Sequence, residues 1–246
     1  MLESKQSAVR DSLLLLHGGG LNSTMWRPQI MALKNRFSIL APDLLAHGTQ
    51  QGKMFRLEGA ISQVAEGIAA TSSRKVVTVG LSLGGYLAIA HAATHPHQVR
   101  GIIISGCCVQ YLGLMGFLAR LNAFTLNFVS PRGFCRLQKK ILRRHLSKTI
   151  VDRLADSGFS LNGAKESLLE LVNKDFIAML DKVECPVLIV NGQRDKLNRK
   201  YAPKLLAAAK QGAATVIRDS GHLCSLEQAD VFSCIVSDFA EKVCVK

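Results

Sequence analysis

The sequence of 246 residues predicts an α/β fold with a mostly parallel sheet, flanking helices and an inserted helical cap. Short apolar runs alternate with longer helix-like runs, a pattern typical of strands and crossover helices in a parallel sheet. The alternation stops between residues 109 and 182, where helical and loop patterns continue without a convincing strand. This segment is several times longer than a crossover needs. We therefore expect a core domain of residues 1–108 and 183–246, and a helical cap of residues 109–182.

Six runs qualify as strands because they are short and apolar and end in turn-forming or small polar residues. They cover residues 12–16, 37–41, 76–81, 99–104, 187–191 and 215–218. Helices are expected at residues 57–70, 83–94, 202–210 and 226–243. Pro96 limits the second of these helices. The capping-box spacing of Ser225-Leu226-Glu227-Gln228 marks the start of the last one.

The carboxyl ends of these strands are where chemistry is expected, because ligands of open parallel sheets bind there. Gly80-Leu81-Ser82-Leu83-Gly84, at the end of the third strand, fits the G-x-S-x-G pattern of a nucleophile elbow. A tight strand-to-helix turn projects the serine hydroxyl clear of the sheet, and it needs small residues on both sides. We predict Ser82 as a nucleophile; the competing interpretation is a serine in an ordinary turn.

A serine hydroxyl needs a base, and His222 follows the last expected strand. The imidazole needs an orienting carboxylate, which we assign to Asp195, four residues past the strand that ends at Asn191. Asp219 is the rival acid, but it lies three residues before His222 and is expected to cap or brace that loop. The histidines expected to pack, support a turn or face solvent are His47, His91, His95, His97 and His145.

A tetrahedral intermediate also needs hydrogen-bond donors for its oxyanion. One donor is expected to be the backbone N–H of Leu83, directly after the nucleophile. The second is expected from His17-Gly18-Gly19-Gly20 after the first strand, because glycines let the backbone approach a ligand. We assign it to Gly19, with Gly20 as the alternative; a flexible glycine turn is the competing interpretation.

At this point the chain resembles the α/β-hydrolase superfamily over essentially its whole length. The matching stretches are LLLLHGGG (13–20), APDLLAHG (41–48), VGLSLGGYLA (79–88), PVLIVNGQRD (186–195) and SGHLCSLEQ (220–228). The resemblance implies a catalytic Ser82–His222–Asp195 set and a pocket between the sheet and a cap that follows the sixth canonical strand. Serine at position 82 argues against epoxide hydrolases and haloalkane dehalogenases, which use aspartate there.

Within the superfamily, HGGGLNSTMW (17–26) followed by GLSLGG (80–85) is similar to a group of small esterases. The group includes the pimeloyl-[acyl-carrier protein] methyl ester esterases of biotin synthesis. These enzymes often carry a bulky residue where this chain has Gly19, and the difference predicts a wider acyl pocket. Trp26 matches the group in position and is expected to pack in the core beneath the oxyanion loop.

The formal net charge of +13 favours acidic partners. Residues 132, 136, 140, 144 and 148 are basic at a spacing of four, so one helix would align them in a stripe, with 139 and 143 beside it. A solvated basic face is the ordinary interpretation. The alternative is a docking surface for an acidic acyl-carrier protein, an anionic membrane or an anionic substrate. The candidate docking residues are Arg136, Lys140, Arg143 and Arg144.

These residues predict a carboxylic ester hydrolase that forms an acyl-enzyme on small to medium acyl esters, without a metal or cofactor. The alternatives are an esterase for acyl groups on an acidic carrier protein, a lactonase and, outside enzymes, a hydrolase-fold ligand receptor. Nucleic acid is not expected as a partner, because the basic stretch offers little aromatic surface for stacking bases. We expect a monomer or a homodimer.

The expected location is the cytoplasm. The first residues, MLESKQSAVR, lack the apolar stretch of a secretory signal. The longest apolar runs, such as residues 13–16, are far shorter than the ~20 residues that span a bilayer. The seven cysteines form no C-x-x-C pair, so we expect reduced thiols rather than a zinc or redox site.

Overall fold

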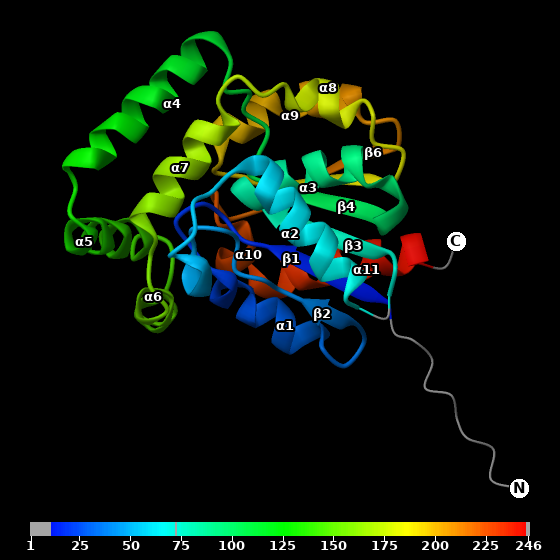
Figure 1. Cartoon of the computed structure of the whole chain (residues 1–246). Coiled ribbons are helices and arrows are strands. Elements are labelled where there is room, and N and C mark those ends of the chain that lie inside the picture. Colours follow the sequence, from blue (N-terminus) through cyan, green and yellow to red (C-terminus); the bar gives the residue numbers. More distant parts are fainter. Residues whose placement is uncertain (1–10, 72, 245–246) are drawn as a thin grey trace, which may run out of the picture.

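The computed structural model describes residues 11–71 and 73–244, in which six strands form one sheet (Figure 1). The strand order is β2-β1-β3-β4-β5-β6, and every neighbouring pair is parallel. This confirms the α/β fold with a mostly parallel sheet. The strands are β1 (Ser12–Leu16), β2 (Ser38–Leu40), β3 (Val76–Leu81), β4 (Val99–Ser105), β5 (Val187–Gly192) and β6 (Gly212–Ile217).

Helices cover both faces of the sheet (Figure 1). One face packs against α1 (Arg27–Leu33) and α11 (Ala229–Cys244). The other face packs against α2 (Leu57–Ala69), α3 (Leu83–Thr94), α8 (Phe176–Leu180) and α9 (Lys196–Ala208). Short helical turns are η1 (Ser23–Trp26), η2 (Gly48–Gln50), η3 (Pro96–Gln98), η4 (Leu126–Phe128) and α10 (Cys224–Glu227).

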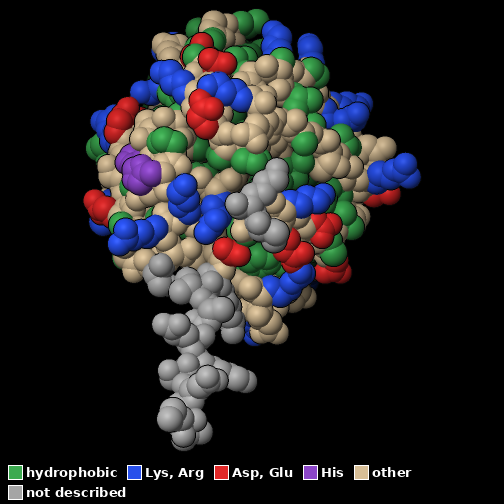
Figure 2. All heavy atoms as spheres, turned by 90° about the vertical axis from the view of Figure 1, so that its right-hand side faces the viewer, with side chains coloured by type: hydrophobic (Ala, Val, Ile, Leu, Met, Phe, Trp, Pro, Cys, Tyr) green, Lys and Arg blue, Asp and Glu red, His purple; other side chains and the backbone are tan. Residues whose placement is uncertain are grey.

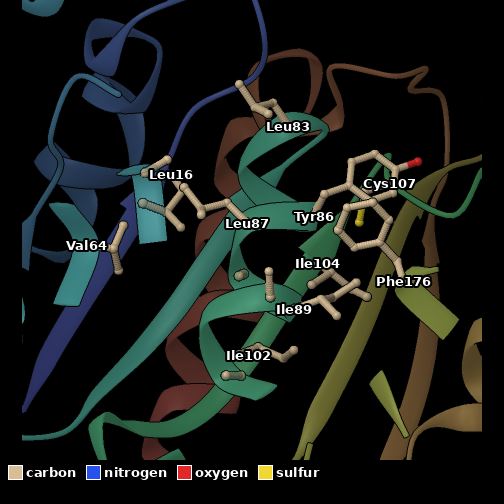
Figure 3. Close-up of a cluster of buried hydrophobic side chains, with 14 of the residues drawn as sticks. Leu16, Val64, Leu83, Tyr86, Leu87, Ile89, Ile102, Ile104, Cys107 and Phe176 are labelled. Carbon is tan, nitrogen blue, oxygen red and sulfur yellow. The ribbon is translucent and has the colours of Figure 1, made fainter. Parts of the chain in front are cut away.

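The two cores follow from the alternation of side chains along each strand. Leu13 and Leu15 of β1 belong to the core beneath α1 and α11, whereas Leu14 and Leu16 belong to the core beneath α3. All four side chains are fully buried, and burial of each contributes about 2 kcal/mol to stability. Figure 3 shows the core beneath α3, where Leu87 lies near Leu16. The sheet is therefore a rigid platform for the loops at its carboxyl edge.

The segment between β4 and β5 holds α4 (Gly113–Thr125), α5 (Pro131–Leu142), α6 (Lys148–Asp156) and α7 (Leu161–Leu171), followed by α8. In Figure 1, α4 to α7 lie together on one side of the molecule, beyond the sheet. The starts of α5 to α8 are set locally, because a side chain before each helix accepts a backbone N–H of the first turn. These N-cap residues are Ser130, Ser147, Ser160 and Asp175.

Two helix predictions were wrong at their boundaries. Helix α9 begins at Lys196 rather than at residue 202, because the Asp195 carboxylate accepts the backbone N–H of Asn198 and caps the helix there. The last expected helix is two helices, α10 and α11, which meet at Gln228. Ser225 lies inside α10 instead of capping it, and the Glu227 carboxylate accepts the N–H of Gly221.

Candidate active site

Ser82 occupies the turn from β3 into α3. Its backbone has φ 52° and ψ −114°, a conformation that costs a residue with a side chain about 1–3 kcal/mol. The Ser82 N–H donates to the carbonyl oxygen of Ser105 at 2.7 Å, which ties the turn to β4. A Cβ added to Gly80 would collide with the backbone of Gly84, and one added to Gly84 would collide with Leu16. The flanking glycines are therefore required by the close backbone approach.

His222 and Asp195 come from two different loops and meet at the carboxyl edge of the sheet. The distance between His222 Nδ1 and Asp195 Oδ2 is 2.8 Å. A Cβ on Gly192 would collide with the carbonyl oxygen of Gly221, so glycine lets the loops after β5 and β6 approach each other. The Asp195 side chain is 8% exposed and that of His222 46% exposed. The pair thus presents one imidazole edge outward and anchors the other on a buried carboxylate.

Asn198 also supports the Asp195 carboxylate. Its side-chain amide donates to Asp195 Oδ2 at 2.9 Å, and its carbonyl oxygen accepts the N–H of Cys108 at 2.8 Å. Burial favours the neutral acid, but hydrogen bonds from His222 and Asn198 outweigh it and hold the pKa of Asp195 below its ordinary value. The sequence analysis missed Asn198. The sequence could have indicated this contact, because the backbone N–H three positions after an N-cap aspartate donates to the aspartate side chain.

A cavity of about 270 Å³ opens between the sheet edge and α5. Ser82, His222 and Gly19 line it, so these three predicted residues are brought together. Leu83 begins α3 beside them, because a Cβ on Gly19 would lie 3.9 Å from the Cβ of Leu83. The remaining lining residues are Gly18, Leu21, Leu81, Gln138, Ile141, Leu142, His145, Gly221, Leu223 and Glu227.

Two buried histidines fix the glycine loop that carries Gly19. His47 Nε2 accepts the N–H of Gly20 at 2.9 Å, and His17 Nε2 accepts the N–H of Leu44 at 3.0 Å. Both rings must be neutral to accept, and burial lowers the pKa of His47 and lowers that of His17 to about 3. The N–H of Gly20 is therefore engaged by His47, and no such bond occupies the N–H of Gly19 among the described residues. His47 supports this loop, as the sequence analysis expected.

Asp219, the rival acid, points elsewhere. It is exposed and pairs with Arg194 at 3.3 Å. His145 is exposed, as expected, and it also lines the cavity, with Nδ1 4.0 Å from Glu227 Oε2. The capping-box spacing predicts that Glu227 lies within a helix cap, whereas its side chain is 5% exposed and lines the cavity. No spacing pattern in the sequence places His145 and Glu227 together.

The prediction of a single basic stripe on one helix was wrong, because α5 ends at Leu142 and a new helix starts at Lys148. Arg143 is engaged with Asp152 at 3.0 Å, and Lys139 and Lys148 pair with the same carboxylate. The other candidate docking residues are exposed and form no ion pair within the described part of the chain; they are Arg136, Lys140 and Arg144.

The described residues hold no group of three or more His, Cys, Asp or Glu side chains placed to bind a metal ion. Across residues 11–71 and 73–244, no helix is long and apolar enough to cross a membrane. Trp26 is fully buried and packs near Phe232, with ring centroids 6.1 Å apart, which confirms its expected role in the core.

Known proteins resemble the chain over nearly its whole length. Pimeloyl-[acyl-carrier protein] methyl ester esterase of Neisseria meningitidis (strain MC58) is 27% identical over 259 residues, covering 97% of this chain and 96% of the relative. The enzyme of the same name from Yersinia enterocolitica is 28% identical over 256 residues, covering 94% and 93%. Pyrrolizixenacetamide deacetylase of Xenorhabdus hominickii is 24% identical over 252 residues, covering 92% and 90%.

Solved structures share the fold. A thermophilic esterase from Thermogutta terrifontis superposes with a TM-score of 0.81 at 23% identity, covering 95% of this chain and 90% of the other. The enol-lactonase of Burkholderia xenovorans LB400 superposes with a TM-score of 0.77 at 20% identity, covering 94% of this chain and 91% of the other. The sequence model of the alpha/beta hydrolase family matches residues 13–233, from the first strand into the last helix. With a parallel sheet, an elbow after β3 and this family match, the chain belongs to the alpha/beta hydrolase family.

Proposed function

We propose that the chain is a carboxylic ester hydrolase with Ser82 as nucleophile, His222 as general base and Asp195 as the group that orients the imidazole. The observation that carries the proposal is the shared cavity of Ser82 and His222, with His222 Nδ1 held on Asp195 at 2.8 Å. An Nδ1–H that donates to Asp195 leaves Nε2 unprotonated and available to accept the serine proton. The low pKa of Asp195 keeps the carboxylate ionised for this role.

The proposed reaction proceeds through an acyl-enzyme. His222 Nε2 takes the hydroxyl proton as Ser82 Oγ attacks the ester carbonyl carbon. The N–H groups of Gly19 and Leu83 donate to the oxyanion, and collapse expels the alcohol, which receives its proton from His222. A water then gives a proton to His222 Nε2 as its oxygen attacks the acyl carbon. The bond between the acyl carbon and Ser82 Oγ breaks, Oγ takes the proton back from His222, and the carboxylic acid leaves.

The cap, residues 109–182, is proposed to act as a lid that shapes the acyl site. Helix α5 supports this, because Gln138, Ile141 and Leu142 line the cavity opposite the glycine loop. The rest of the wall includes the apolar side chains of Leu21, Leu81 and Leu223, which suit an apolar acyl chain of small to medium length. A Cβ at Gly19 would lie 3.1 Å from Ser167 Oγ of α7, so the glycine loop packs closely against the cap at this point.

A second proposal concerns the substrate carrier. The relatives in Neisseria and Yersinia are named for an ester on acyl-carrier protein. Arg136, Lys140 and Arg144 are exposed and form no ion pair with another described residue, so they favour an acidic carrier. Helix α5 also supplies part of the cavity wall. A carrier docked on α5 would deliver its acyl chain to the adjoining cavity.

The test is an activity panel of p-nitrophenyl esters of increasing acyl length, a lactone and a carrier-bound methyl ester. Ser82→Ala is expected to lower kcat about 10⁶-fold on every accepted ester. Equal and negligible rates of wild type and Ser82→Ala on the whole panel would overturn hydrolysis. A ligand-dependent rise in Tm without turnover would instead assign the fold to ligand sensing.

A further inference from the structure

Helix α4 buries its small residues and exposes its large apolar residues, the opposite of an ordinary surface helix. The side that packs against α7 carries the small residues Gly116, Ala119 and Ala123, which are buried. The side that faces solvent carries large apolar residues at helical spacing, continued by η4. Leu114 is 68% exposed and Phe128 78% exposed. The exposed apolar face of α4 is formed by Leu114, Phe117, Leu118, Leu121, Phe124 and Phe128.

An apolar face of this kind marks an interaction site, because soluble proteins rarely leave large contiguous apolar patches in water. The helix lies at the outer margin of the molecule, beyond α7 (Figure 1). None of its residues lines the cavity of Ser82 and His222, so substrate binding there does not cover it. The apolar face of α4 therefore needs a partner of its own.

Two cations, Arg120 of α4 and Lys165 of α7, lie on the flank of this face, whereas the acids of α7, Glu166 and Glu170, bind residues 55–57. Residues 67–151 contain no Asp or Glu. A groove of about 450 Å³ between α4 and α7 is lined by Arg120 and Lys165 together with Phe124 and Leu169. Lys165 Nζ donates to the side-chain oxygen of Asn127 at 3.0 Å, and Arg120 forms no ion pair within the described residues. Cations and apolar side chains thus share one surface.

The side of the molecule to the right in Figure 1 is different. Figure 2 shows that Lys and Arg side chains lie next to Asp and Glu side chains on that side, and apolar atoms are scattered among them. A mixed surface of this kind is the ordinary solvated surface of a protein. Exposed large apolar side chains beside Arg120 and Lys165 distinguish the α4 side from the face in Figure 2.

We propose that α4 docks on an anionic phospholipid bilayer. Its apolar side chains would enter the acyl boundary of the leaflet, as in interfacial amphipathic helices. Arg120 and Lys165, at the groove on the flank of the same helix, would meet lipid phosphates. A second copy of the chain is disfavoured as occupant, because it would bring two cationic surfaces together. The proposal concerns a membrane surface and is independent of the hydrolysis proposed at Ser82.

The test measures binding of the purified full-length protein to phosphatidylcholine vesicles with and without phosphatidylglycerol. Binding is expected only with the anionic lipid. Phe117→Ser with Leu121→Ser is expected to lower the partition coefficient about tenfold. Arg120→Gln with Lys165→Gln is expected to lower it about 25-fold, because each cation near an anionic surface contributes about fivefold. Hydrolysis of a soluble p-nitrophenyl ester should remain at the wild-type rate in both double variants.

Matched controls come from the other faces of the molecule. Met31→Ser with Val231→Ser removes exposed apolar side chains on α1 and α11, and Lys53→Gln with Lys204→Gln removes two exposed cations. Both controls should bind vesicles like wild type. Binding that is absent, independent of phosphatidylglycerol, or unchanged in the α4 variants would overturn the proposal. A dimer of wild type that the α4 variants convert to monomer, without vesicle binding, would assign the face to a second copy instead.

Discussion

The imidazole of His222 packs against the backbone of Gly106 at the end of β4, in the space that a side chain at position 106 would fill. A Cβ added to Gly106 would lie 2.7 Å from His222 Cε1 and 2.9 Å from His222 Nδ1. Gly106 also has φ +61°, a conformation that disfavours any other residue. The imidazole therefore rests directly on backbone, and the missing side chain of Gly106 sets how deeply the ring can sit beside Asp195.

Gly106→Ala is expected to displace the imidazole and to lower kcat/KM for an ester about 100-fold, since a shift of about 1 Å in a reacting group has this effect. Steady-state kinetics with a p-nitrophenyl ester would measure it. Gly113→Ala is the matched control, because Gly113 has φ +51° but nothing within 4 Å of an added Cβ. It should lose about 1 kcal/mol of stability through strain and keep full activity. Equal activity in the two variants would contradict the positioning role of Gly106.

The choice between the two candidate acids gives a second prediction. Asp195→Asn preserves the helix cap and the shape of the side chain but is expected to lower kcat about 10⁴-fold, because the amide favours the wrong imidazole tautomer. Asp219→Asn should leave kcat unchanged, since Asp219 is exposed and pairs with Arg194. Parallel kinetics of the two variants would decide; a larger loss in Asp219→Asn would reverse the assignment.

The sheet and the elbow were predictable from sequence because both depend on local patterns. Buried parallel strands are continuous apolar runs that end in turn-formers, and the close approach at Ser82 leaves no room for side chains at Gly80 and Gly84. The order of strands and loops then places Asp195 and His222 at the same edge. The meeting of their side chains follows from topology, so it could be expected without coordinates.

The cap could not be predicted to the same depth, because its geometry depends on tertiary packing. The prediction of one basic stripe assumed a continuous helix. The chain turns between Leu142 and Lys148 instead, and Leu142 and Leu146 are buried there. Ser147 then caps the new helix, and Asp152 gathers the nearby cations. His145 reaches the cavity only because this turn lies over it. Periodicity within one segment contains no information about such contacts.

A third prediction concerns stability and pH. Burial lowers the pKa of His17 to about 3 and that of His91 to about 4, so both rings stay neutral in the folded chain. In the unfolded chain an imidazole binds a proton near pH 6.5. The unfolded state therefore holds more protons below pH 6.5, and stability falls as the pH falls. Each histidine should contribute a loss of about 2 kcal/mol between pH 7 and pH 5.

Urea unfolding at pH 7, 6 and 5 would measure this loss. His91→Gln is expected to reduce the difference between pH 7 and pH 5 by about 2 kcal/mol, because one buried imidazole is removed. Restricting the range to pH 5 and above separates the histidines from Asp43 and Asp195, whose lowered pKa values act in more acidic solution. His97→Gln, at an exposed position, should leave the difference unchanged. A pH-independent stability of wild type would contradict the neutral buried rings.

The fourth prediction tests carrier docking on α5 and the residue that follows it. Arg136→Glu, Lys140→Glu and Arg144→Glu, combined, should raise KM for a carrier-bound methyl ester about tenfold, because three surface attractions become repulsions. The KM for a p-nitrophenyl ester should not change, since none of the three side chains lines the cavity. Added salt should raise the wild-type KM for the carrier-bound ester towards that of the triple variant.

Two controls separate docking from a general effect of charge. Lys204→Glu changes an exposed cation on α9, far along the chain from α5, and should leave both KM values unchanged. Arg143→Glu breaks the ion pair with Asp152 and should lower Tm. It should leave the KM for the carrier-bound ester near the wild-type value, because Arg143 is already paired with Asp152. Equal increases in KM for the carrier-bound and the soluble ester in the triple variant would refute docking, since a distorted cavity would then explain both. A carrier effect confined to the triple variant would identify the exposed cations of α5 and its end as the recognition surface.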